Sequence, residues 1–572
     1  MKNDFLSFNV IGKFIFWSVF ISVAYLLMGK IFPLSLNKYV RAMYIMPVEK
    51  YPFLSILYVA ITASFFYINL KRKKDIKCYA VIIASVFFWL AGIFSIQEIS
   101  YMSHNSVAVF VFLFISLIAL TTTLFLITYF EKLNVFSLYF SLIIPLGSIY
   151  YFAILPWSTP DAVRHMAAVY RFSNKALMQE EWGARKIDSD FFENVWVNYT
   201  NVSPDGYRAV LDNIENPVSP ENIEELSIKD TNMTCYSFVS YLPLVLGVIT
   251  SRLCSLNTLQ MAYAAKLFMF IFYVFGVFLA IKTIPRFKYV IAMVSLLPMS
   301  LMYASGISYD GMVIITTLNF IASLFAFGEK DTRLNLLMVC IWTFLMVSCK
   351  GGGYILLLPL IFGLKKIRPI ALILGVAFLS VLVFNGFLYT NQPMFQLNKN
   401  IDGNLYTSWA FGHPLEYIGL LFNTYKKYFF GLFLQMFGFK LGWLQRTIDE
   451  NFIIFIFAIM LLAAIKEGIG KRGEYINVFL SVFVLSAAIL TIPLLLLCET
   501  SKDADFIFGL QGRYFLPFLP VFMFLVGSIS NKLPIKVQNV IKKININAVF
   551  LCFTLVSYAC VYCMVQYFWR AS

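Results

Sequence analysis

Charge is scarce in this 572-residue chain, because only 13% of its residues are Asp, Glu, Lys or Arg and 60% are hydrophobic. Histidine is scarcer still, with three residues, and the nine cysteines lack the paired CxxC motifs that hold zinc. A mean hydropathy of +0.77 excludes a soluble globular protein, whose apolar fraction is about 45–50%. The sequence predicts an all-α polytopic membrane protein without a zinc-type site.

Apolar runs of about 20 residues, long enough to cross about 30 Å of hydrocarbon, recur along the chain. Together with two shorter runs, 334–348 and 354–364, they predict a bundle of about 13–16 spans. We interpret Gly351-Gly352-Gly353, between the shorter runs, as a break between short helices. The longer runs are 11–32, 51–70, 78–97, 107–129, 135–155, 260–281, 289–306, 311–328, 369–389, 451–465, 475–497, 514–530 and 546–568.

Basic residues predict the orientation in the cell membrane. If the N-terminus is cytoplasmic, five basic clusters fall on the cytoplasmic side, as the positive-inside rule requires. The net charge of +15 then reflects topology and gives no indication of nucleic-acid binding. The same orientation keeps the apolar segment 236–256 on the outer face, as an interfacial or re-entrant helix. The clusters are Lys71–Lys74, Lys282/Arg286/Lys288, Lys365/Lys366/Arg368, Lys466/Lys471/Arg472 and Lys532/Lys536/Lys542/Lys543.

Two large extracytoplasmic segments interrupt the predicted membrane domain. The first outer loop, 155–257, is acidic, since its part 155–235 holds 13 acidic and 7 basic residues. The second, 390–450, contains amphipathic helical stretches. We therefore predict four regions, namely an N-terminal addition of about four spans over 1–134, a core membrane domain over 135–389, the outer segment 390–450, and C-terminal spans over 451–572.

The first apolar-to-polar transition outside the membrane carries candidate catalytic residues. Thr159 suits a helix N-cap and Pro160 the first helical position, which places Asp161 in the first turn. His165 lies four residues later, on the same face, with Arg164 beside it. Two structural alternatives stay open, in which Asp161 only favours the helix dipole and His165 only makes a structural hydrogen bond.

Further polar residues gather at the predicted outer ends of spans. An acid in apolar sequence, such as Asp310, is costly unless it faces water, a partner or a substrate. Asp310 could equally be a structural partner of Lys350 or Arg513, and Arg513 could reach lipid headgroups. The residues at these ends are Asp310, Lys350, His413, Arg513 and Tyr514.

Four groups of residues resemble, in the same order, motifs of the bacterial membrane-protein family catalogued as domain of unknown function 2142, placed with the type-C glycosyltransferase superfamily. They cover about residues 150–530. The chain departs from the family at Ala162, where the family has Glu, and at Gln445, where an acid often stands. The four groups are Pro160-Asp161 with His165 and Tyr170; Ser308-Tyr309-Asp310; His413-Pro414 with Asn423-Thr424 and Leu441-Gly442-Trp443-Leu444; and Gln511-Gly512-Arg513-Tyr514-Phe515-Leu516-Pro517.

The resemblance implies an enzyme that takes a sugar from a polyprenyl-phosphate donor and passes it, outside the cytoplasmic membrane, to a surface glycan such as O-antigen or to another acceptor. Asp161 matches the acid that type-C enzymes place in the first large outer loop, so it is the candidate general base, with His165 and Asp310 as its neighbours. The substrate-binding candidates are Lys350 and Arg513 for the lipid phosphate, together with Arg164, His413 and Tyr514.

Other readings of the sequence remain open. We expect no cofactor, and the alternative is a divalent ion held by carboxylates, as in some type-C enzymes. A lipid-linked oligosaccharide transporter or flippase should carry charges at membrane mid-depth, whereas the charges here cluster at span ends. A glycan polymerase or ligase would act on larger lipid-linked donors. A purely structural assembly subunit would leave the ordered Asp161, Asp310 and Arg513 motifs unexplained.

Overall fold

A computed structural model describes residues 134–186, 188, 223–225, 237–383, 405, 407–442, 446–470 and 477–570. The predicted N-terminal region and its spans 11–32, 51–70, 78–97 and 107–129 lie outside these residues. The chain divides into two compact units, and the larger comprises residues 150–202 and 212–560. The elements described below belong to this larger unit, except that α6 (Val135–Ala153) begins and α23 (Ile546–Arg570) ends in the smaller one.

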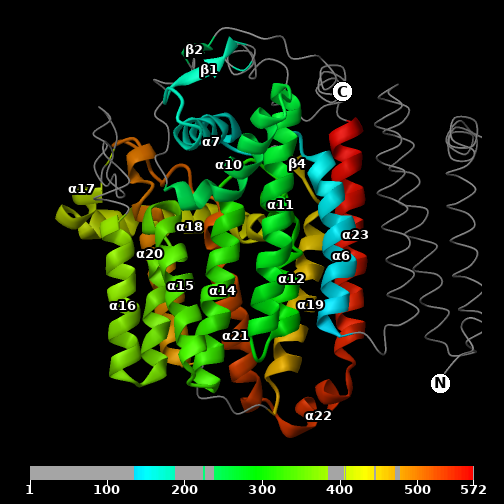
Figure 1. Ribbon diagram of the computed structural model, residues 1–572. Helices are drawn as coiled ribbons and strands as arrows, with labels where there is room; N and C mark the ends of the chain where they lie inside the picture. The colour runs from blue at the N-terminus through cyan, green and yellow to red at the C-terminus, as the bar shows by residue number, and fades with distance from the viewer. Residues whose placement is uncertain are drawn as a thin grey trace, which may run out of the picture. The chain divides into compact units, whose positions relative to one another are not determined.

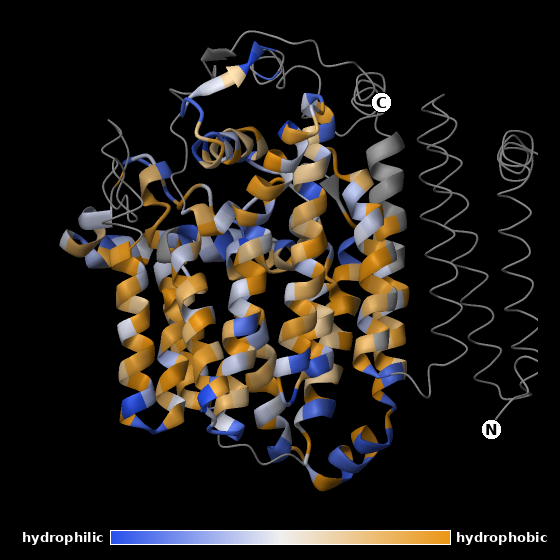
Figure 2. Ribbon diagram, viewed as in Figure 1, coloured by the Kyte–Doolittle hydropathy of each residue, from blue (hydrophilic) through white to orange (hydrophobic). Residues whose placement is uncertain are grey.

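Long apolar helices make up the membrane part of the larger unit. Helices α11 (Thr258–Thr283), α14 (Asp310–Glu329), α15 (Arg333–Ser348) and α16 (Ile367–Leu382) run side by side (Figure 1). Three further helices of the larger unit are α19 (Glu450–Gly468), α20 (Val478–Leu494) and α21 (Leu519–Ile529). Figure 2 shows that hydrophobic residues dominate their length, with hydrophilic residues gathered toward the ends.

Five helical segments within the described ranges are long and apolar enough to cross a membrane, or six if the bent pair α22 (Ile535–Lys543) and α23 counts as one span. These segments confirm an all-α polytopic membrane protein. Three further apolar helices, α15, α16 and α10 (Phe238–Leu253), have 16 residues each and fall short of the spanning length. The total number of spans and the four predicted regions stay predictions.

Two predicted runs fold differently from the expected continuous helices. The run 289–306 forms two short helices, α12 (Lys288–Ser295) and α13 (Pro298–Ala304). Proline lacks an N–H and disfavours helical backbone at the residue before it, so Pro298 begins a new helix and does not continue the old one. The run 354–364 forms the 3₁₀ helix η3 (Ile355–Leu364), which contains Pro359. The break predicted at the glycines is confirmed by the short η2 (Cys349–Gly352).

Shorter elements complete the larger unit at both ends of the bundle. Figure 1 shows α7 (Ala162–Ala176) at one end and α22 at the other, while α18 (Pro414–Phe437) crosses the long helices near their ends. Two antiparallel pairs join β1 (Gly183–Arg185) to β2 (Ile223–Glu225), with Ala184 opposite Glu224, and β3 (Lys440–Leu441) to β4 (Arg446–Thr447). The remaining elements are α17 (Thr407–Gly412), η5 (Leu497–Glu499), η6 (Gly512–Phe518) and η7 (Ser530–Lys532).

A buried lysine attaches the start of the segment that follows α6 to α11. The side chain of Lys266 is fully buried, and its Nζ donates to the carbonyls of Tyr151, 2.6 Å away, and Ile154, 2.5 Å away. These carbonyls stand at the end of α6, where the last turn leaves acceptors unsatisfied and the helix dipole favours a cation. Lys266 of α11 therefore determines the direction in which the chain leaves α6.

Candidate functional site

Helix α7 begins two residues later than the sequence predicts. Its N-cap is Asp161, in left-handed backbone with φ of 59°, and the Asp161 side chain makes no capping hydrogen bond. Thr159, the predicted N-cap, is buried, and its hydroxyl donates to the Ile307 carbonyl at 3.3 Å. That contact with a distant segment outweighs the local capping preference of Thr159. The Asp161 carboxylate is consequently left for other contacts.

The acid and the histidine of this motif face different surroundings. The Asp161 side chain is 42% exposed and lies 3.9 Å from the Arg164 guanidinium. His165 is only 2% exposed, its Nδ1 is hydrogen-bonded to the Tyr241 hydroxyl at 2.9 Å, and its ring meets the Tyr309 ring edge-on at 4.8 Å. The predicted sharing of one helix face by Asp161 and His165 therefore brings no side-chain contact between them within the described residues.

Burial sets the charge state of His165. Removal from water lowers the pKa of His165 to about 4, although the negative charges of Asp161 and Asp310 oppose this shift. The imidazole is therefore neutral near pH 7. A neutral imidazole with one nitrogen on Tyr241 fits a side chain that holds α7 against α10 and the loop before α14.

We expect a pH dependence of stability from this histidine. Between pH 6.5 and about 4 the His165 imidazole binds a proton in the unfolded chain but stays neutral in the folded protein. The free energy of unfolding therefore falls as the pH falls through this window. The loss attributable to His165 should reach about 3 kcal/mol at pH 4. Melting midpoints of purified wild type and His165→Gln, compared from pH 7 to 4, measure it as a difference in slope. Parallel slopes for the two proteins would contradict the assignment.

Asp310 is the centre of a buried charged cluster formed by three distant segments. It is the first residue of α14, where the positive end of the helix dipole favours a carboxylate, and it is 6% exposed. Its Oδ1 lies 3.7 Å from Lys350 Nζ, and its Oδ2 lies 3.5 Å from Arg513 Nη1. The Ser308 hydroxyl donates to Oδ2 at 3.3 Å. The predicted partnership of Asp310 with Lys350 and Arg513 is thus present with both cations at once.

Tyrosine rings surround the two cations. Lys350 Nζ lies 4.1 Å from the centre of the Tyr514 ring and 5.0 Å from that of Tyr309. Arg513 donates to the hydroxyls of Tyr303 and Tyr514. Cations over aromatic faces gain stabilisation without losing their charge. The cluster is therefore a pair of cations beside one carboxylate, with tyrosine rings packed around them.

The charges of this cluster do not cancel. One carboxylate faces two cations, Lys350 Nζ and Arg513 Nε are buried without a hydrogen-bond partner in the part of the chain that the structure describes, and no second acid contacts them there. Lys350 lies in the η2 turn, where burial lowers the pKa of its ammonium to about 8 and Asp310 opposes that shift. Near pH 7 the lysine is still mostly charged. The arrangement can accept an anion with hydrogen-bond acceptor oxygens.

Helix α18 sets the position of Arg513. The Gly512 N–H donates to the Gln435 side-chain carbonyl at 2.7 Å, and a Cβ on Gly512 would come within 2.1 Å of the Leu432 carbonyl oxygen. Only glycine allows η6 to approach α18 this closely. No local pattern indicated that Gln435, Tyr241 or Tyr303 belongs to the site, whereas Tyr309 and Gly512 stand inside the motifs beside Asp310 and Arg513.

The other predicted substrate-binding residues occupy different places. His413 is exposed, its ring stacks on the Trp409 ring at 5.3 Å, and the structure gives it no contact with Asp310, Lys350 or Arg513 among the described residues. Arg164 is exposed and contacts Asp161. Tyr514 is the one further candidate that joins the cluster. The catalytic and binding roles of all these residues stay predictions.

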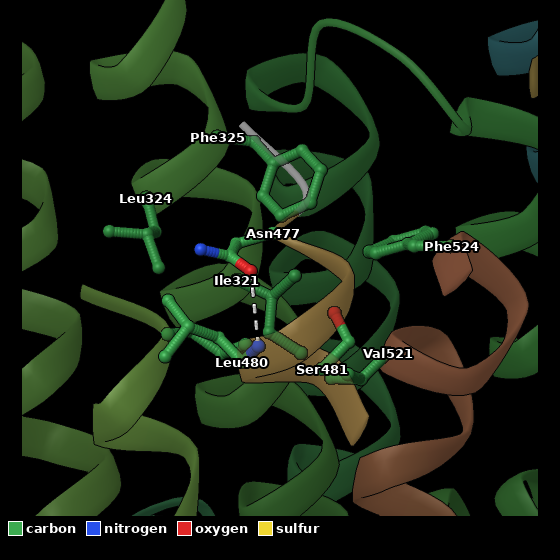
Figure 3. A pocket seen from close by; sticks show the side chains of 9 residues that line it. Ile321, Leu324, Phe325, Asn477, Leu480, Ser481, Val521 and Phe524 are labelled. Atoms are coloured by element: carbon green, nitrogen blue, oxygen red, sulfur yellow. Dashed lines mark hydrogen bonds between the residues drawn. The ribbon is translucent and has the colours of Figure 1, made fainter. Parts of the chain in front are cut away.

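Neither a metal-ligand set nor the small pocket of Figure 3 adds to the site. Within the described ranges, no group of three or more His, Cys, Asp or Glu side chains could hold a metal ion. The pocket in Figure 3 lies between α14, α20, α21 and η3, with Ile321 and Phe524 on its apolar wall and Asn477 accepting the Leu480 N–H. The residues that line it do not include those of the charged cluster.

Comparison with known proteins identifies a family but no individual protein that matches the chain. Neither a curated protein nor a solved structure matches the chain. A family model described as "Predicted membrane protein (DUF2142)" matches residues 151–522. The match covers more than half of the chain, and it includes Asp161, the Asp310 cluster and Arg513. The chain belongs to the DUF2142 family of predicted membrane proteins.

Proposed function

We propose that this protein is an integral-membrane glycosyltransferase that moves a sugar from a polyprenyl-phosphate donor to an acceptor such as a surface glycan, on the extracytoplasmic side of the cell membrane. The observation that carries the proposal is the pair Lys350 and Arg513, whose Nζ and Nε atoms are buried, which shares one acid and keeps a surplus positive charge. A lipid-linked phosphate supplies the missing negative charge and the acceptor oxygens. The resemblance to type-C enzymes supports the same reading.

Transfer then needs a base and a stabilised leaving group. The acceptor hydroxyl oxygen attacks the anomeric carbon, the bond from that carbon to the phosphate oxygen breaks, and its electron pair stays on the lipid phosphate. The hydroxyl proton passes to the Asp161 carboxylate. Lys350 and Arg513 stabilise the negative charge on the departing phosphate, in a buried setting that strengthens such interactions.

Asp161 suits the role of base better than Asp310. Both oxygens of the Asp310 carboxylate face cations, Arg513 at 3.5 Å and Lys350 at 3.7 Å, and Asp310 is only 6% exposed, so an acceptor hydroxyl has little access to it. Asp161 has one exposed guanidinium at 3.9 Å, and its side chain is open to an acceptor. We therefore assign Asp310 to hold Lys350 and Arg513 in position, and His165 to support Tyr309 at the edge of the cluster.

The direct test is donor consumption by the purified protein with a polyprenyl-phosphate sugar, together with comparison of the surface glycan by mass in a deletion strain. A chelator tests the expectation that no cofactor is needed, since transfer that is lost in EDTA would instead favour a divalent ion held by carboxylates. An unchanged glycan and no donor consumption would favour the transporter reading. Consumption only of diphosphate-linked oligosaccharides would favour a polymerase or ligase.

Arg513→Ala should weaken use of the lipid donor. A hydrogen bond to a charged group is worth about 1.5–3 kcal/mol, so the donor KM should rise about tenfold to a hundredfold. Initial rates over a range of donor concentrations measure this change. Arg333→Ala, which removes an exposed arginine at the start of α15, is the matched control and should leave the donor KM unchanged. An unaltered donor KM in Arg513→Ala would remove Arg513 from the phosphate site.

A further inference from the structure

We propose that helix α22 is an interfacial helix that binds anionic phospholipid headgroups at the end of the bundle opposite α7. This inference is independent of the proposed enzymatic function. It depends on the two faces of α22, on its attachment to the spanning helices and on the charge of the final part of the chain.

The two sides of α22 differ in chemistry. Lys536, Lys542 and Lys543 are exposed and lie within about half a turn of one another around the helix. Val537 and Val540 lie on the other side and are also exposed, at 42% and 65%, whereas the exposed Ile535 at the start of the helix lies among the lysines. None of the nine α22 residues is buried. A helix with lysines on one side and apolar residues on the other, both uncovered by protein, is typical of the membrane interface.

The neighbouring elements fix α22 at one end of the bundle. It follows α21 after a short connection, and it meets α23 at a bend of 72°. The Gln538 side chain donates to the carbonyls of Asn531, 3.0 Å away, and Leu533, 2.9 Å away, which fixes the connection. Figure 1 shows α22 lying across the end of the bundle, and Figure 2 shows hydrophilic and hydrophobic residues alternating along it.

The surrounding charge is positive. The chain contains no Asp or Glu after Asp505, so the charged residues of α22 and of its connections are all lysines. Lys532 precedes α22 in η7, and Lys466 of α19 donates to the Lys542 carbonyl. The nearby acid Glu467 accepts the Val290 N–H. Phosphate groups of anionic lipids complement these ammonium groups, and each lysine near such a surface favours binding about fivefold.

The test uses the full chain in nanodiscs that contain equal amounts of phosphatidylglycerol and phosphatidylethanolamine. Native mass spectrometry gives the ratio of the two lipids that the protein retains. The triple variant Lys536→Gln/Lys542→Gln/Lys543→Gln should lower the retained phosphatidylglycerol ratio at least fivefold. Lys536→Arg/Lys542→Arg/Lys543→Arg should keep it, because the charges remain.

Two controls keep the result interpretable. Lys426→Gln/Lys427→Gln, on exposed residues of α18, should leave the ratio at the wild-type value. Hydrogen exchange of the α22 amides should be slower in phosphatidylglycerol nanodiscs than in phosphatidylcholine nanodiscs, and this difference should vanish in the Gln variant. Retention of the wild-type ratio by the Gln triple variant, an equal loss in the Arg variant, or exchange in wild type that does not depend on the lipid would each overturn the proposal.

Discussion

Asp161→Asn should lower the turnover number for the proposed sugar transfer by about 10²–10⁴-fold, which is the usual contribution of a positioned general base. The amide cannot accept the proton of the acceptor hydroxyl, although it keeps the size of the side chain. Asn also tolerates the left-handed backbone that residue 161 adopts, so α7 should begin at the same place. The measurement is the single-turnover rate with saturating polyprenyl-phosphate sugar and acceptor.

Controls separate loss of the base from loss of the fold. Expression, elution as a single species and the melting midpoint of Asp161→Asn should match those of wild type. The donor KM should change little, because the carboxylate lies outside the Asp310 cluster. Full transfer activity in Asp161→Asn would show that another group, or water, accepts the proton.

The largest effect on stability should follow from Asp310→Asn. Removal of the carboxylate leaves two buried cations without their shared partner, and breaking a buried ion pair in this way costs about 3–5 kcal/mol. Asn keeps the side-chain size and a hydrogen-bond acceptor for the Ser308 hydroxyl. The unfolding transition of the purified protein in detergent measures the loss as a lower melting midpoint.

A double variant tests whether this cost is electrostatic. Lys350→Met alone leaves Asp310 paired with Arg513, whereas Lys350→Met in the Asp310→Asn background removes one of the two stranded cations. The double variant should therefore recover part of the stability that Asp310→Asn loses. If the two substitutions instead add their costs, the packing of the side chains, and not their charge, is what Asp310 contributes.

Local sequence patterns predicted the membrane helices well, because a run of apolar residues long enough to cross the bilayer has few alternatives. Helices α11, α14, α19 and α20 lie close to their predicted ranges. The two short helices α12 and α13 were missed although Pro298 stood in the sequence, since the hydrophobic run continues through it.

The geometry of the site depends on contacts that no local pattern contains. The sequence placed Asp310, Lys350 and Arg513 at span ends, but only the packing of α14, η2 and η6 brings Lys350 and Arg513 within 4 Å of the Asp310 carboxylate. The start of α7 shows the same limit, because the Thr159 hydroxyl contacts a carbonyl 148 residues away and not its own helix. Local capping rules cannot foresee such a contact.

The attachment of Lys266 to the end of α6 has a consequence for the transfer that we propose. The buried Lys266 ammonium of α11 binds the carbonyl of Ile154, seven residues before Asp161. The segment that carries the proposed base is therefore anchored to a membrane helix. In the proposed reaction, the acceptor is therefore brought to Asp161 while the backbone near this residue keeps its place. Selection among acceptors in the proposed reaction then depends on which acceptor hydroxyl can reach the Asp161 carboxylate.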